Sequence, residues 1–297
     1  MIDSAKGILK ISVLIVFCFI TNTIQAQLTD LARLEYSFIP KSDSEDEYTR
    51  FRGSFNIPLQ TSEDCYFIIG AEYNRIILEL EDQYPFSTDG LRRIHVADLN
   101  LAYTFKTNEN WRIGLRFAPR IASTLTGRLS MDDVFLNGGV LAINDKRKDE
   151  SLKRPYRLIL GLTYNSTTGL PFPLPFISYF RQVNEKWSFN LGIPKMNLKH
   201  YLNEKNSIQG FFSIDGYYAN IHDRINIDGN QAQHVSLSAI VGGLGYEYKF
   251  TKHLVAYTYT GYTLRLTNTI RDNNRDKLFN LGNVNAFYLR TGIKFKI

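Results

Sequence analysis

The sequence has few cysteines and, after its first segment, no long hydrophobic run. Its 297 residues include two cysteines, Cys18 and Cys65. We expect Cys18 to be removed with an N-terminal leader, which leaves Cys65 without a partner for a disulfide or a cysteine-based metal site. No later apolar run approaches the ~20 residues of a membrane-spanning helix. These absences exclude a disulfide-stapled domain and a helical membrane protein. A transmembrane barrel, whose strands need only about 9–11 residues, remains open.

Histidines and the common catalytic motifs are also scarce. The histidines show no pair at metal-ligand spacing, and the chain contains neither a G-x-S-x-G segment nor a glycine-rich phosphate loop. We therefore predict no metal, no cofactor and no enzymatic activity. A membrane-embedded hydrolase is the least favoured alternative, because nothing in the linear sequence brings serine and histidine together. The histidines are His95, His200, His222, His234 and His253.

No charge of one sign predominates in the chain. There are 35 Lys and Arg against 29 Asp and Glu, a formal net charge of +6 that is spread along the sequence. A nucleic-acid-binding protein would gather its basic residues in a patch. Nucleic acid is therefore not an expected partner.

The first residues have the layout of a secretory signal peptide. Lys6 and Lys10 precede the apolar run 11–20, and Ala26 supplies a small residue where cleavage is expected. We assign residues 1–26 to the signal peptide and residues 27–297 to a single domain.

Segments of alternating polarity follow one another along residues 27–297. In the segment 111–120, Trp111, Ile113, Leu115 and Phe117 fall on one face, while three arginines fall on the other. We predict about fourteen strands, with twelve as the alternative; the short runs 187–193 and 196–202 could form one interrupted strand. The clearest other runs are 31–40, 48–59, 65–76 and 95–105, and further strands start near Phe135, Tyr156, Phe176, Trp187, Met196, Ser207, Val235 and Leu254.

Short polar turns alternate with longer polar loops. A turn such as 107–110 or 203–206 follows one strand, and a loop such as 81–92 or 221–233 follows the next. This arrangement is typical of outer-membrane barrels. A soluble β-sandwich also alternates, but its strands average about 5–6 residues and its outer face is polar. The charged stretch 144–154 departs from the pattern, because it falls on the short-turn side.

The fold class that we predict is all-β: a closed, antiparallel, up-and-down transmembrane β-barrel. A change of apolar parity between Val241 and Leu244 suggests a bulge at Gly242 and Gly243. The run 254–266 keeps no clear parity, and its faces stay unassigned.

The last residues, "AFYLRTGIKFKI", alternate apolar and basic side chains. A barrel closes by pairing its first and last strands, so we expect this strand to pair with the first. The segment 291–297 resembles the C-terminal insertion signal of bacterial outer-membrane proteins, with Gly292, Phe295 and Ile297 at its defining positions. That resemblance implies a partner, the outer-membrane assembly machinery.

The middle of the chain resembles a family of uncharacterised outer-membrane barrels from Bacteroidota. The resemblance rests on "LNGGVLAI" (136–143), on the segment 158–195 with its Gly-Leu-x-Tyr strand and Leu-Pro pair, and on "LKHYLNEKNSIQGFF". It implies an outer-membrane barrel exported across the inner membrane of a Gram-negative cell, and it assigns no role to any residue.

Polar residues on the faces expected to point inward are the candidate site. Two hypotheses follow. In the first, a basic lumen forms a small-solute pore that favours anions, as rings of Arg or Lys do. In the second, the basic side chains pair with acidic neighbours, and a closed structural barrel meets lipid, lipopolysaccharide or other partners through its long loops. The candidates are Arg50, Arg52, Glu72, Asp98, Arg112, Arg116, Arg120, Arg290 and Lys294.

Overall fold

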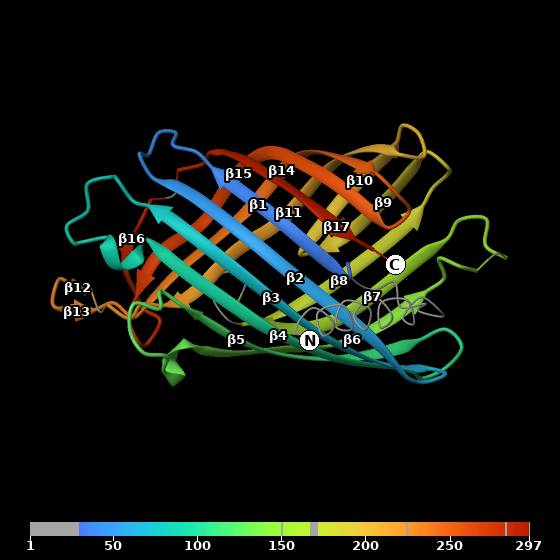
Figure 1. Cartoon of the computed structure of the whole chain (residues 1–297), viewed down its shortest axis with the longest axis horizontal. Coiled ribbons are helices and arrows are strands. Elements are labelled where there is room, and N and C mark those ends of the chain that lie inside the picture. Colours follow the sequence, from blue (N-terminus) through green and yellow to red (C-terminus); the bar gives the residue numbers. More distant parts are fainter. Residues whose placement is uncertain (1–29, 150, 167–171, 224, 283, 297) are drawn as a thin grey trace, which may run out of the picture.

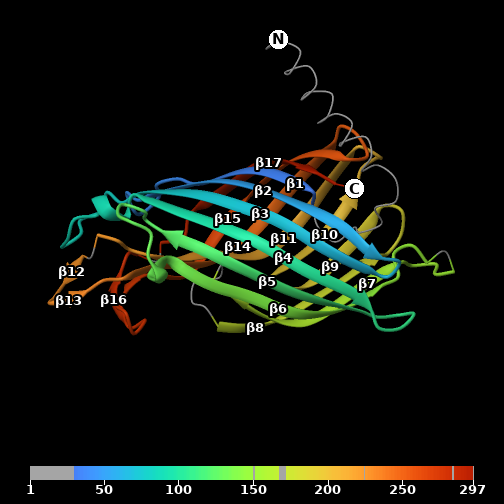
Figure 2. The same ribbon diagram turned by 60° about the horizontal axis from the view of Figure 1, so that its bottom comes forward.

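A computed structural model describes residues 30–149, 151–166, 172–223, 225–282 and 284–296. The signal peptide assigned to 1–26 and the terminal Ile297 lie outside the described residues. Fourteen antiparallel strands form a closed barrel, which confirms the predicted fold class and the higher of the two predicted strand numbers (Figures 1 and 2). The runs predicted as one or two strands near residue 194 are two separate strands.

The elements follow the chain in a simple order. The barrel strands are β1 (Ala32–Ile39), β2 (Glu47–Ser62), β3 (Cys65–Glu79), β4 (Arg93–Lys106), β5 (Arg112–Ser123), β6 (Val134–Asp145), β7 (Tyr156–Asn165), β8 (Phe172–Gln182), β9 (Trp187–Ile193), β10 (Lys195–Tyr201), β11 (Asn206–Asn220), β14 (His234–Lys249), β15 (Leu254–Arg271) and β17 (Phe287–Phe295). The loops carry the 3-10 helices η1 (Asp89–Leu91) and η2 (Met131–Asp133), the hairpin β12 (Asn226–Ile227) and β13 (Asn230–Gln231), and the short strand β16 (Lys277–Asn280).

Each barrel strand pairs with the next, and the last pairs with the first. β17 lies antiparallel between β15 and β1, with Leu34 opposite Ile293 and Phe38 opposite Leu289. This closure pairs the first strand with the last, as a barrel in lipid requires. Gly292 and Phe295 of the predicted insertion signal lie in β17.

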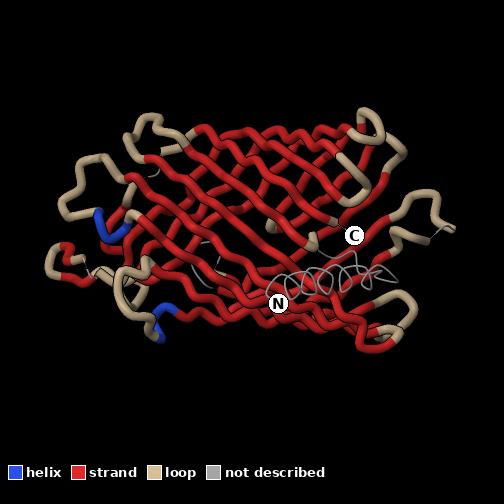
Figure 3. The backbone as a smooth tube through the Cα atoms, in the orientation of Figure 1, coloured by secondary structure: helices blue, strands red, loops and turns tan. Residues whose placement is uncertain are grey.

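Long loops and short turns lie at opposite ends of the barrel. Both 3-10 helices and the β12–β13 hairpin lie at one end, which we call the loop end, and the end of β17 lies at the other, the turn end (Figure 3). The charged stretch between β6 and β7 lies at the turn end. As the sequence indicated, it is an exception there, because the other connections at this end are short. Among the described residues, no helix is long and apolar enough to cross a membrane.

The outer face of the barrel wall is apolar. Alternate residues along the strands are large, hydrophobic and exposed, such as Phe117 at 49% and Leu162 at 57%. A soluble protein rarely exposes so much contiguous apolar surface. Strand alternation therefore places a belt of lipid-compatible side chains outside and the charged residues inside.

Two strands, β9 and β10, are much shorter than their neighbour β11. Each has seven residues, while β11 has fifteen. The last pair between β10 and β11 is Lys195 with Ser213. Beyond it, β11 crosses to β5, where Asn220 pairs with Ser123 and accepts a hydrogen bond from the N–H of Thr124 at 3.1 Å. At the loop end, β11 therefore contacts β5 directly, without the strands β6 to β10 between them.

The bulge predicted at Gly242 and Gly243 is wrong. β14 keeps its register there with both neighbours, and its irregularity lies between Ser238 and Ala239, opposite β15. A Cβ at Gly243 would lie 2.1 Å from the carbonyl oxygen of Thr260, so glycine is required by close strand approach. The apolar parity changes because the interior changes: Val241 faces an apolar core inside, whereas Leu244 faces outward at 70% exposure.

The core is a plug of apolar side chains inside the loop end of the barrel. Inward residues of β3, β4, β14 and β15 pack there with residues of the loops, and Tyr48 stacks on Tyr217 with ring centroids 6.3 Å apart. At this end the inner face is therefore apolar, unlike the faces that carry the predicted polar candidates. Among the most buried members of the plug, each at most 1% exposed, are Ile76, Leu91, Ile94, Val235, Ile270 and Leu281.

Leu162→Arg tests the assignment of the outer face. A cation placed in the middle of the apolar belt should lower the free energy of unfolding in lipid vesicles by about 2–4 kcal/mol. Leu202→Arg is the matched control, because Leu202 has a similar exposure, 52%, but lies in a turn. Equal effects of the two substitutions in urea titrations would contradict a lipid-facing belt.

Candidate functional site

A layer of ion pairs lies below the apolar plug, formed by inward side chains of β1, β2, β11 and β17. Asp215 accepts from Arg50 at 2.8 Å and from Arg290 at 2.6 Å. Glu35 lies 3.7 Å from Arg290 and 3.9 Å from Arg52. Each carboxylate thus lies between two guanidinium groups.

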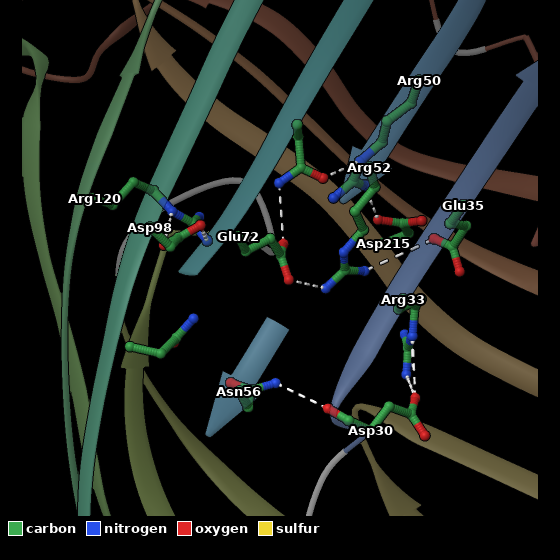
Figure 4. A network of polar contacts seen from close by, with 12 residues as sticks. Asp30, Arg33, Glu35, Arg50, Arg52, Asn56, Glu72, Asp98, Arg120 and Asp215 are labelled. Carbon is green, nitrogen blue, oxygen red and sulfur yellow. Dashed lines mark hydrogen bonds and ion pairs between the residues drawn. The ribbon is translucent and has the colours of Figure 1, made fainter. Parts of the chain in front are cut away.

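The same layer continues along the wall toward β5. Arg52 donates to Glu72 at 2.6 Å, and Asn74 joins it by donating to Glu72 at 3.0 Å (Figure 4). Arg120 binds Asp98 through two nitrogens, at 2.7 and 3.0 Å. Asp98 and Arg120 are buried, and a charge in such a place is tolerated only when it is paired.

A third group lies nearer the turn end. Glu247 accepts from Lys199 and Lys294, each at 2.8 Å, and from the hydroxyl of Tyr259 at 2.7 Å. Gln209 donates to the same carboxylate at 3.1 Å. Through these hydrogen bonds, the carboxylate on β14 is joined to four other strands, β10, β11, β15 and β17.

The residues predicted to face the lumen do not form one ring of cations. The structure places Arg50, Arg120, Arg290 and Lys294 in ion pairs with carboxylates, and Arg52 with Glu72. Two predicted candidates differ. Arg112 donates to the carbonyl oxygen of Asp64 at 2.7 Å, near the turn end, and Arg116 donates to the neutral Asn100 at 2.5 Å.

Sequence reasoning missed two carboxylates of the network, Glu35 and Asp215. Glu35 alternates with Leu34 and Tyr36, so strand parity alone could have placed it inside. Asp215 lies in the run "FFSIDGYY", where apolar residues occupy both parities because the plug begins there. No local signal identifies it.

Beside this network lies a chamber of about 820 Å³. Its wall comes mainly from β2 to β8, and it extends to Asp30 and Lys296 at the turn end. Arg116 and Asn100 line it on one side, and Leu141, Ile159 and Phe176 on another. Its volume lies in the range of ordinary ligand pockets.

At the loop end, a histidine and an aspartate fasten two loops together. The ring Nε2 of His222 lies 2.8 Å from Asp133, and its Nδ1 accepts a hydrogen bond from the N–H of Gly127 at 2.9 Å. Burial raises the pKa of Asp133, but hydrogen bonds from Asn220, from the N–H of Ser130 and from His222 outweigh burial and lower it to about 2.

This pair lacks the arrangement of a catalytic base. Both ring nitrogens of His222 are engaged, so neither can take a proton from a nucleophile. Within the described ranges, no serine hydroxyl hydrogen-bonds a histidine ring, and no group of three His, Cys, Asp or Glu residues could hold a metal ion.

Comparison with known proteins identifies a family. The family model DUF6268, described as a domain of unknown function, matches residues 22–296, and the chain belongs to this family. No curated protein matches the sequence.

Several solved structures are similar at low sequence identity. The NanC porin is 11% identical, with 90% of this chain and 100% of that chain covered and a TM-score of 0.38. The translocator domain of the autotransporter NalP from Neisseria meningitidis is 11% identical, covering 99% and 98%, with a TM-score of 0.39. The KdgM porin is 9% identical, covering 89% and 99%, with a TM-score of 0.35.

The pair of Asp98 and Arg120 allows a test of the buried network. Asp98→Asn should lower the free energy of unfolding by about 3–5 kcal/mol, because it leaves the Arg120 guanidinium buried without a counter-charge. The double variant Asp98→Leu/Arg120→Met should lose less than either single variant. Lys106→Gln, which removes the exposed partner of Asp64, serves as the control and should have little effect.

These effects are measured by urea unfolding of the refolded protein in micelles. If the change in the free energy of unfolding of the double variant equals the sum of the changes in the two single variants, Asp98 and Arg120 do not stabilise one another.

Proposed function

We propose that the protein is an integral outer-membrane barrel whose loop end is closed and whose working compartment is the chamber that extends to the turn end. The observation that carries this proposal is the apolar plug, which fills the lumen between β2, β3, β4, β11, β14 and β15 with side chains that water does not reach. A barrel with such a plug has no continuous aqueous path along this part of its axis.

The proposed location rests on three features. The outer face is apolar, the loops and turns are segregated to opposite ends, and the first residues have the layout of a signal peptide. In outer-membrane barrels the short turns face the periplasm. The chamber would therefore be reached from the periplasmic side, and the long loops would meet lipopolysaccharide or partners outside. Insertion would require the outer-membrane assembly machinery.

The ion pairs favour this closed barrel over an open anion pore. Five of the predicted basic candidates are paired with carboxylates, so little of their charge is available to a passing anion. We also propose that the protein is not an enzyme. The engaged ring of His222 supports this proposal, since neither of its nitrogens is free to act as a base at the site formed with Asp133.

A gated small-solute pore is the second candidate. It is favoured by the chamber itself, which already occupies part of the lumen and is lined by Arg116 and Lys296. Conduction would then require the plug to move.

The closed barrel predicts that the refolded protein is electrically silent in a planar bilayer. The measurement is made under a salt gradient, with protein that is shown to be folded by its heat-modifiable migration on a gel. Stable unitary steps would contradict the proposal and favour the pore.

The pore candidate makes a further prediction about selectivity. If steps appear with an anion-selective reversal potential, replacing Arg112, Arg116 and Arg120 with Gln should weaken that selectivity, because the substitutions remove three positive charges from one strand.

A further inference from the structure

The chamber has two chemically different sides. On the side of β6, β7 and β8, apolar side chains form a patch between Arg157 and Asn165, the polar lining residues near the two ends of β7: Leu141 and Ile143 lie beside Ile159, and Gly161 lies opposite Phe176 in the strand register. Leu174, opposite Thr163, extends the patch toward the loop end. On the side of β2 to β5 the lining is polar, with Arg52, Glu72, Asn100 and Arg116.

Arg116 is the cation best placed to meet a ligand. The other central arginine of the lining, Arg52, is held by Glu72 and Glu35. The only hydrogen bond described for the Arg116 guanidinium goes to the neutral oxygen of Asn100. It lies next to the apolar patch, because Arg116 is opposite Gly139, and Gly139 is opposite Thr163. A partly buried guanidinium without a carboxylate is a natural partner for an anionic group.

Gly114 keeps the space between the two sides open. Gly114 lies on the inner face of β5, two residues from Arg116, and a Cβ there would meet its nearest atoms at 3.7 Å. Alanine would therefore fit at this position without strain. A larger side chain at Gly114 would project into the chamber.

The chamber reaches the end of the β9–β10 hairpin, where the barrel wall is shorter along the barrel axis because both strands are short. Pro194 forms the turn, and Pro175 and Ile193, both exposed, line the same cavity as Phe176. A seven-residue strand is about 23 Å long and, at a tilt of about 40°, about 18 Å high. The apolar band of an outer-membrane barrel is about 25 Å tall. The end of the hairpin therefore lies within the membrane.

We propose that the chamber binds an anionic amphiphile with a linear alkyl chain. Its head group would contact Arg116 and Asn100, its chain would lie on the patch of Leu141, Ile159 and Phe176, and it would pass between chamber and membrane over the β9–β10 hairpin. This rests on the proposed function, because an open pore would carry water through the same space.

The test uses dodecanoate that carries a photoreactive diazirine at the end of its chain, added to the protein in nanodiscs. Crosslinks should map to residues 174–176 and 193–194, and binding of radiolabelled dodecanoate should be saturable. Dodecanol should bind about tenfold more weakly, since it lacks the charge-assisted bond to Arg116. Acetate, which has no chain, should not compete. Crosslinks spread evenly over the outer face would overturn the proposal.

Two pairs of variants separate the head-group contact from the chain contact. Arg116→Gln should weaken dodecanoate binding about tenfold and leave dodecanol binding unchanged. Arg112→Gln, on the same strand but outside the chamber, should change neither. Gly114→Phe should abolish binding of both compounds, and Leu115→Phe, on the outer face, should abolish neither. Unchanged dodecanoate binding in both Arg116→Gln and Gly114→Phe would refute the site.

A free fatty acid and a phospholipid share this chemistry, and mass spectrometry of protein extracted in mild detergent distinguishes them. Either molecule, bound to the natural protein and lost in Gly114→Phe, supports the proposal. An electrically silent barrel that binds no dodecanoate overturns this inference alone. A conducting barrel overturns the proposed function, whatever it binds.

Discussion

Filling the interior is the constraint on which the rest of this structure depends. A barrel of about eight strands is filled by its own side chains, whereas one of 16–18 leaves a channel. With fourteen strands, this protein lies between the two cases. β11 leaves the short strand β10 and reaches β5 through Asn220 and Ser123. The loop end is thereby narrowed enough for an apolar core to fill it. The space left over, on the side of β6 to β8, becomes the chamber.

The charged layer follows from that arrangement. Side chains that continue the inner face below the plug are shielded from water, so each charge there needs a counter-charge. Asp215 between Arg50 and Arg290, and Glu247 between Lys199 and Lys294, meet this need across strands that are far apart in sequence. The ion pairs therefore fix the positions of β11 and β14 relative to β2, β10 and β17. Arg116 differs, since its described hydrogen bond goes to the neutral Asn100 and not to a carboxylate.

Strand periodicity predicts most of the fold because a lipid-facing belt imposes a strict alternation. The strands around Leu99 and Phe117, the inward position of Arg120 and the pairing of β17 with β1 all follow from it. Three features do not. Val241 and Leu244 suggested a bulge, because an apolar interior was not expected; the parity change was in fact the signal of the plug. Asp215 is hidden among apolar neighbours, and the chamber depends on the bypass of β10 by β11, a tertiary contact that no local pattern encodes.

The central claim is that the lumen is divided into a packed loop end and an accessible chamber. Its most direct test is the reactivity of single cysteines toward a charged, membrane-impermeant thiol reagent, in protein whose Cys65 is replaced by serine. Thr163→Cys in the chamber should react readily, and Val235→Cys, which is 0% exposed in the plug, should react only after unfolding. Similar rates at both positions in the folded barrel would show a continuous aqueous lumen and contradict this account.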